Sequence, residues 1–238
     1  MKTIHTFLSV NFICLVLVAG VNALTLTSAE GVWTGTSGGS YVRYINDATI
    51  DYGNGLEDQV FWGSPATHRG QSGLGFTGSA SADTPLNFEF GDAFTIGQLR
   101  HFNNPIYTGS AANQAFLDIS LGFSDPAGLD DVFNMTFGID ETTNTSDREE
   151  SADHITISDA YAVQVFEFSG VEYTFEFLGF GDTADDLISS FTSYEEMTND
   201  TELWGKITAV NPVPEPTTML LFGFGLLGMA NVARRKLG

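Results

Sequence analysis

The chain has 238 residues and carries 9 basic against 30 acidic side chains, for a formal net charge of −21. This excess argues against nucleic acid and anionic lipid as partners of the folded part, because like charges repel. Hydrophobic residues make up 42% of the chain, too many for a disordered acidic polymer, and a single cysteine excludes a disulfide framework. The composition therefore predicts an acidic globular protein.

The N-terminal residues are typical of a secretory signal peptide. Lys2 supplies a positive charge, residues 8–20 form an apolar stretch of 13 residues, and small residues lead up to a cleavage position after Ala23. Cys14 lies inside the apolar stretch without the small preceding residue that a lipoprotein anchor needs. We expect residues 1–23 to be removed, which leaves a mature chain without thiols.

Residues 24–212 show the alternation of apolar and polar residues that is typical of β-strands, with no sustained helical period. Clusters of Gly, Asn, Asp, Ser and Pro between the strands supply turns. The pattern predicts an all-β fold, a single β-sandwich or jelly-roll-like domain. The expected strands are 32–36, 41–45, 59–62, 86–90, 95–102, 115–123, 132–140, 154–159, 162–168, 171–180 and 202–210.

Two segments of this domain have patterns of their own. Residues 163–177 predict the clearest hairpin, with its turn at Ser169-Gly170 and alternate phenylalanines on one face. Residues 182–193 fit either a short helix or a long loop.

Several motif matches lack the context that their chemistry requires. Residues 73–78 fit G-x-G-x-x-G, but a loop follows where a dinucleotide site needs a helix, so we interpret them as a glycine-rich strand or bulge. Residues 35–39 fit G-x-S-x-G, but a strand follows, which favours a flexible turn over a nucleophile elbow. The mature histidines are too widely spaced for a zinc site, and we expect His101 to be a hydrogen-bonded structural residue.

Acidic residues gather in the expected loops. Asp130-Asp131 and Asp140-Glu141 offer the hard oxygen ligands that calcium prefers. No segment fits the EF-hand spacing, and a solvated acidic rim explains the same residues. Two hypotheses therefore remain for these residues: a calcium site at Asp130, Asp131, Asp140 and Glu141, or a solvated acidic rim. No other cofactor is expected.

The C-terminal end has three parts in order. Val213-Pro214-Glu215-Pro216 is followed by the apolar residues 217–233 and then by Arg234-Arg235-Lys236. Seventeen helical residues span about 25 Å, enough for a short membrane helix, and the basic cluster would hold its end on the cytoplasmic side. We expect contact with a membrane through this helix, and a plain tail anchor is one interpretation of it.

The whole tail, residues 213–238, resembles the PEP-CTERM protein-sorting signal of Gram-negative bacteria. The resemblance implies that an exosortase recognises Pro214-Glu215-Pro216 and removes the tail, with Arg234-Arg235-Lys236 as the membrane stop. It also implies an inner-membrane-anchored precursor, which is then sorted to the cell envelope, the cell surface or the exterior.

The body carries a second resemblance. Phe61-Trp62-Gly63, residues 71–76 and residues 96–106 are similar to the choice-of-anchor domains, in particular to choice-of-anchor K. These are bacterial surface or exported β domains that occur with different C-terminal anchoring signals. The resemblance covers most of residues 30–210 and implies no catalytic residues.

We expect an exported, non-enzymatic protein of the cell envelope or extracellular matrix, acting as an adhesive or carbohydrate-binding module on extracellular polysaccharide or another matrix component. The alternative is a secreted polysaccharide hydrolase that uses a carboxylate pair. Such a pair must lie about 5 to 10 Å apart, a distance that Glu167 and Glu176 could approach across the expected hairpin. The aromatic candidates for stacking on sugars are Trp33, Trp62, Tyr107 and Trp204, although tryptophan is usually buried.

Overall fold

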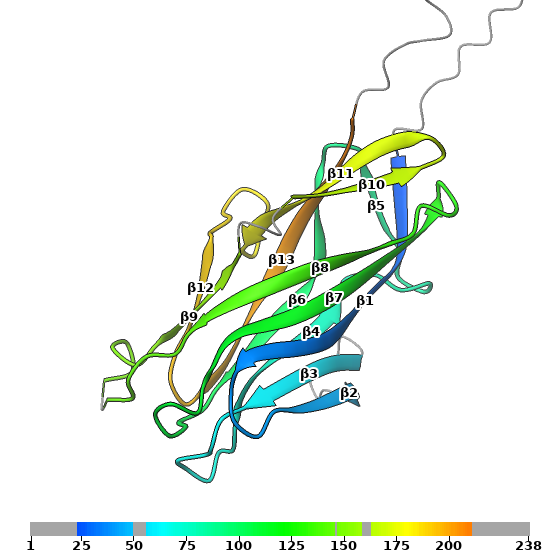
Figure 1. Ribbon diagram of the computed structural model, residues 1–238. Helices are drawn as coiled ribbons and strands as arrows, with labels where there is room; N and C mark the ends of the chain where they lie inside the picture. Colours follow the sequence, from blue (N-terminus) through cyan, green and yellow to red (C-terminus); the bar gives the residue numbers. More distant parts are fainter. Residues whose placement is uncertain (1–22, 50–55, 146, 159–162, 211–238) are drawn as a thin grey trace, which may run out of the picture.

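The computed structural model describes residues 23–49, 56–145, 147–158 and 163–210. In this part of the chain thirteen strands form two antiparallel sheets that pack face to face (Figure 1). The predicted all-β sandwich is confirmed. Within the described residues no helix has the length and apolarity needed to cross a membrane. The expected signal peptide, apart from Ala23, and the expected sorting tail lie outside them.

The six-stranded sheet has the strand order β12-β9-β8-β7-β1-β5. Its longest ladder joins β1 to β7, and several bulges bend this pair. The strands of this sheet are β1 (Ala23–Gly38), β5 (Leu86–Glu89), β7 (Ala112–Asp125), β8 (Asp131–Asp140), β9 (Asp153–Ile157) and β12 (Ser190–Ser193).

The seven-stranded sheet has the strand order β10-β11-β13-β6-β4-β3-β2. Its strands β3, β6 and β13 supply the side chains of the polar network described below, and β4 lies between β3 and β6. The strands of this sheet are β2 (Arg43–Thr49), β3 (Leu56–Trp62), β4 (Ser72–Gly78), β6 (Ala93–Asn103), β10 (Val163–Phe168), β11 (Val171–Phe180) and β13 (Met197–Ala209).

Aromatic rings join the two sheets across the core. Phe133 of β8 stacks on Phe175 of β11 with the ring centroids 4.2 Å apart, and Phe88 of β5 stacks on Phe94 of β6 at 4.1 Å. Full burial of a side chain of this size stabilises the fold by roughly 1.5–3 kcal/mol. Alternate residues of each strand therefore point into one shared core, as the period of two predicts.

The hairpin and glycine-rich strand are found where the sequence predicts them. Ser169 and Gly170 have φ values of 52° and 77°, the left-handed pair that a tight two-residue turn requires. Residues 72–78 form β4, so the strand interpretation of the G-x-G-x-x-G match is correct. The interpretation of residues 182–193 as a helix or a loop is wrong in part, because Ser190–Ser193 pair with β9 as strand β12.

The two ends of the sandwich differ. At one end, which we call the terminal end, β1 begins and β13 finishes (Figure 1). Ala23 pairs there with Glu89, and the Val210 N–H donates to the Glu172 carbonyl at 2.8 Å. The opposite end, which we call the loop end, consists of the connections 39–42, 63–71, 104–111, 141–145, 147–152 and 194–196.

Candidate functional site

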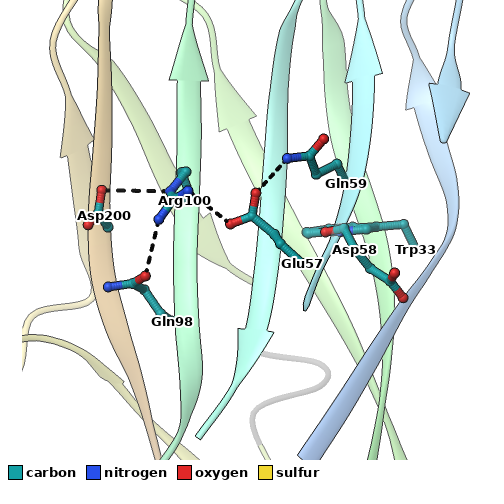
Figure 2. Close-up of polar contacts among 7 residues, drawn as sticks. All are labelled: Trp33, Glu57, Asp58, Gln59, Gln98, Arg100 and Asp200. Atoms are coloured by element: carbon teal, nitrogen blue, oxygen red, sulfur yellow. Dashed lines mark hydrogen bonds and ion pairs between the residues drawn. The ribbon is translucent and has the colours of Figure 1, made fainter. Parts of the chain in front are cut away.

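A polar network crosses the outer face of the seven-stranded sheet (Figure 2). Glu57 on β3 and Arg100 on β6 alternate with core residues, so their side chains point away from the core. The Arg100 Nη1 lies 3.4 Å from the Glu57 Oε2, and its Nε lies 3.9 Å from the Asp200 Oδ1 on β13. The Arg100 Nη2 donates to the Gln98 Oε1 at 3.4 Å, and the Gln59 Nε2 donates to the Glu57 Oε1 at 2.6 Å.

A glycine makes room for this network. Gly75 of β4 lies between β3 and β6, opposite both Gln59 and Arg100. A Cβ at Gly75 would come within 2.5 Å of the Glu57 carboxyl group, so the carboxylate occupies the space that a side chain would fill. Glu57 is only 1% exposed, and this burial raises its pKa against the opposing effects of Gln59 and Arg100. A large substrate has no direct access to this carboxyl, and the network ties three strands together.

A polar hollow of about 520 Å³ lies beside the network on the same face. Its floor includes Thr77, Gln98 and Glu202, which are neighbours across β4, β6 and β13. Burial, and then the charge of Asp182, raise the pKa of Glu202. Hydroxyl groups surround this floor; they belong to Ser79, Ser81, Thr84 and Thr95.

A second hollow, of about 410 Å³, opens at the loop end, and Tyr107 forms part of its wall. The side chain of Tyr107 is 62% exposed, while its backbone is fixed. Its N–H donates to the Ser64 carbonyl at 2.9 Å, and its carbonyl accepts from the Ser110 Oγ at 2.6 Å. The remaining polar lining of this hollow, which we call the loop-end hollow, is Thr108, Asn113, Asp140, Glu141, Thr142, Thr143 and Asn144.

Buried carboxyl groups lie next to the loop-end hollow. Glu141 lines the hollow, and the N–H of the next residue, Thr142, donates to the Asp153 Oδ1 at 2.9 Å. Asp153 is fully buried and Glu195 is 6% exposed. Among the described residues, the Asp153 Oδ2, the Glu141 Oε2 and both Glu195 carboxyl oxygens are buried without a hydrogen-bond partner.

The environment of these three residues, the carboxyl cluster, favours their neutral forms. Burial raises the pKa of Glu141, and the nearby charges of Asp153 and Glu195 raise it further. Burial also raises the pKa of Asp153 and of Glu195. Sequence reasoning missed Asp153 and Glu195 because they come from distant segments that meet only through the pairing of β9 with β12.

The four predicted calcium ligands do not come together. Asp131 begins β8 and Asp140 ends it, so this ten-residue strand separates the two pairs by about 30 Å. The Asp130 Oδ1 accepts the Phe123 N–H and the Asp131 Oδ1 accepts the Val132 N–H. Across the described segments, no group of three or more His, Asp or Glu side chains is arranged to hold a metal ion. A single calcium site from these four residues is therefore wrong.

The predicted carboxylate pair is also separated by the register of its hairpin. Glu167 lies opposite Glu172, and Glu176 lies opposite Val163. Four residues of strand, about 13 Å, therefore separate Glu167 from Glu176, more than the catalytic spacing allows. The Glu176 carboxylate instead pairs with the Lys206 Nζ at 2.8 Å.

Of the aromatic candidates, only Tyr107 presents an open ring. Trp33 and Trp62 are buried in the core. Trp204 is half-buried, and its Nε1–H donates to the Gly181 carbonyl at 2.8 Å. Stacking on a sugar ring is therefore geometrically open at Tyr107 and closed at Trp33 and Trp62.

His101 differs from its prediction in one respect. It is fully buried on the core face beside the Trp62 ring, as a structural residue should be. Neither ring nitrogen has a hydrogen-bond partner among the described residues, so the predicted hydrogen bond is wrong. This burial lowers the pKa of His101 to about 3, which keeps the ring neutral.

The tail that follows β13 carries a family signature. Residues 212–236 match the family model of the PEP-CTERM protein-sorting motif. This chain has a PEP-CTERM motif. The predicted recognition residues Pro214-Glu215-Pro216 and the basic Arg234-Arg235-Lys236 belong to the matched segment and lie outside the described residues.

The PEP-CTERM motif implies processing by an exosortase, export, and sorting to the envelope or surface. No curated protein matches the chain. The similarity of the body to choice-of-anchor domains stays a prediction.

Proposed function

We propose that the mature protein is a non-enzymatic, carbohydrate-binding β-sandwich of the cell envelope or extracellular matrix. Export and exosortase processing follow from the PEP-CTERM motif. Before processing, residues 217–233 hold the precursor in the inner membrane. The predicted similarity to choice-of-anchor domains agrees with a surface protein that has no catalytic residues.

The single observation that carries the binding role is the exposed side chain of Tyr107, on a hydrogen-bonded backbone, in the wall of the loop-end hollow. An aromatic face packs against the C–H face of a sugar ring, and nearby amides and carboxylates bond its hydroxyl groups. Asn113, Asp140 and Asn144 supply such groups. The strongly acidic body disfavours anionic polysaccharides, so a neutral or amino sugar is the expected ligand.

A glycan array probed with mature chain 24–213 tests this role, followed by titration of the best glycan. Tyr107→Ala should weaken binding at least tenfold, about 1.4 kcal/mol, whereas Tyr107→Phe keeps the ring and most of the affinity. Tyr44→Ala, at an exposed tyrosine of β2 outside the hollow, is the matched control. Absence of any bound glycan, or equal binding by Tyr107→Ala, would contradict the proposal.

One observation favours a polysaccharide hydrolase as the second candidate. Glu141 lines the loop-end hollow, and burial raises its pKa, as a general acid requires. Asp140, exposed on the same wall, is the available second carboxylate. Release of reducing ends from a bound glycan, abolished by Glu141→Gln with binding retained, would put this candidate first.

A further inference from the structure

The two chain termini of the described body leave from the same end. Ala23 pairs with Glu89, and two residues later the Gly91 N–H donates to the Ile207 carbonyl of β13 at 2.8 Å. Figure 1 shows the start of β1 and the end of β13 at this terminal end. Any tether at either terminus therefore pulls on one end of the sandwich.

The segment between Val210 and the apolar residues 217–233 is shorter than the sandwich is long. Val210 is still hydrogen-bonded to Glu172, and the apolar segment begins at residue 217. The six residues between them reach at most about 20 Å when fully extended. Strand β1 alone has 16 residues, which corresponds to about 50 Å of sandwich length.

The net charge of the sandwich favours one of its two possible orientations on the membrane, on its side or on its end. Residues 24–213 carry 5 basic and 29 acidic side chains, a net charge of −24. Repulsion from an anionic bilayer acts within about 10 Å in 0.1 M salt. A sandwich lying on its side would place its whole length within this distance of the bilayer. A sandwich standing on its end would place only the terminal end there.

We propose that the precursor stands end-on, with the terminal end facing the anionic bilayer and the loop end pointing away from it. The proposal rests on the membrane-anchored precursor of the proposed function. It presents the loop-end hollow and Tyr107 to the exterior, about 50 Å beyond the terminal end, while the tail is still attached.

Energy transfer to the bilayer tests this orientation. In the full chain, Cys14→Ser removes the only native cysteine, and Ala127→Cys or Ala66→Cys places one label at the terminal end or the loop end. Both alanines are exposed, in the β7–β8 and β3–β4 connections, so the two variants are matched. The chains are reconstituted into phosphatidylethanolamine–phosphatidylglycerol vesicles that contain an acceptor-labelled lipid.

Transfer from position 127 should be several times that from position 66. The difference should shrink in 1 M salt, where the screening length falls to about 3 Å and the body can tip over. Equal transfer from the two positions in 0.1 M salt would overturn the end-on orientation alone. A chain that does not float with the vesicles would overturn the anchored precursor, and the orientation with it.

Discussion

Arg100 lies on the outer face of a sheet, yet water scarcely reaches it. Its side chain is 6% exposed and that of Glu57 is 1% exposed, so each charge depends on the other more than on solvent. A buried ion pair adds little net stability compared with apolar residues, but the loss of one partner leaves an uncompensated charge. Gly75 is the residue that makes this arrangement possible.

Arg100→Met should therefore destabilise the sandwich by about 3 kcal/mol at pH 7, because Glu57 stays buried without its cation. The double variant Arg100→Met/Glu57→Gln should recover most of that loss. Urea unfolding of the single and double variants measures both effects. If the double variant is as unstable as the single one, packing rather than charge is the cause.

Some residues of the candidate site can be predicted from the sequence and others cannot. The sequence predicts Tyr107 as an aromatic for stacking on sugars, and it predicts Glu141 as a calcium ligand rather than as a buried acid. It does not predict Asp153 or Glu195, since their meeting depends on the pairing of β9 with β12. The separation of Asp131 from Asp140 likewise follows from β8 being one unbroken strand.

Among the elements, the strands with clear alternation were predictable and those without it were not. The hairpin β10–β11 has alternate phenylalanines and a Ser-Gly turn, and it forms as expected. Strand β12 has four residues and a single large apolar side chain, Phe191, so it shows no period that could be read. The first part of β1 adjoins the expected signal peptide and is rich in small residues, which hid a strand that begins at Ala23.

Edge strand β10 is held to the opposite sheet by side-chain hydrogen bonds that no sequence pattern predicts. The Asn134 N–H donates to the Gln164 Oε1 at 3.0 Å, and the Gln164 Nε2 donates to the Asn134 carbonyl at 3.0 Å. Gln164 thus joins β10 of one sheet to β8 of the other.

Gln164→Ala should cost about 1 kcal/mol, because the two hydrogen bonds are partly solvated. It should also speed hydrogen exchange in β10 and leave exchange in β7 unchanged. Val165→Ala, at an exposed neighbour on the same strand, is the control. Equal hydrogen exchange in β10 of both variants would show that the two hydrogen bonds between Gln164 and Asn134 do not hold this edge strand.

For the whole molecule, the carboxyl cluster sets an unusual dependence of stability on pH. The folded-state pKa is raised to about 9 for Glu141 and to about 7 for Asp153, above the ordinary carboxyl values near 4. A raised carboxyl pKa means that the folded state binds more protons than the unfolded one. The stability that this extra proton binding gives the folded state is fully present below pH 4. It is lost as the pH rises through the folded-state pKa values of about 7 and about 9.

We therefore expect the melting temperature of the mature chain to fall between pH 6 and pH 9, by an amount equivalent to a few kcal/mol or less. Asp153→Asn removes one titrating group, keeps the shape and should flatten this decline, so that the variant loses less stability than the wild type over that range. Asp92→Asn, at an exposed acid of the terminal end, changes the net charge equally and should leave the decline intact. Parallel declines in all three proteins would mean that self-repulsion of the acidic body, rather than the carboxyl cluster, weakens the fold at high pH.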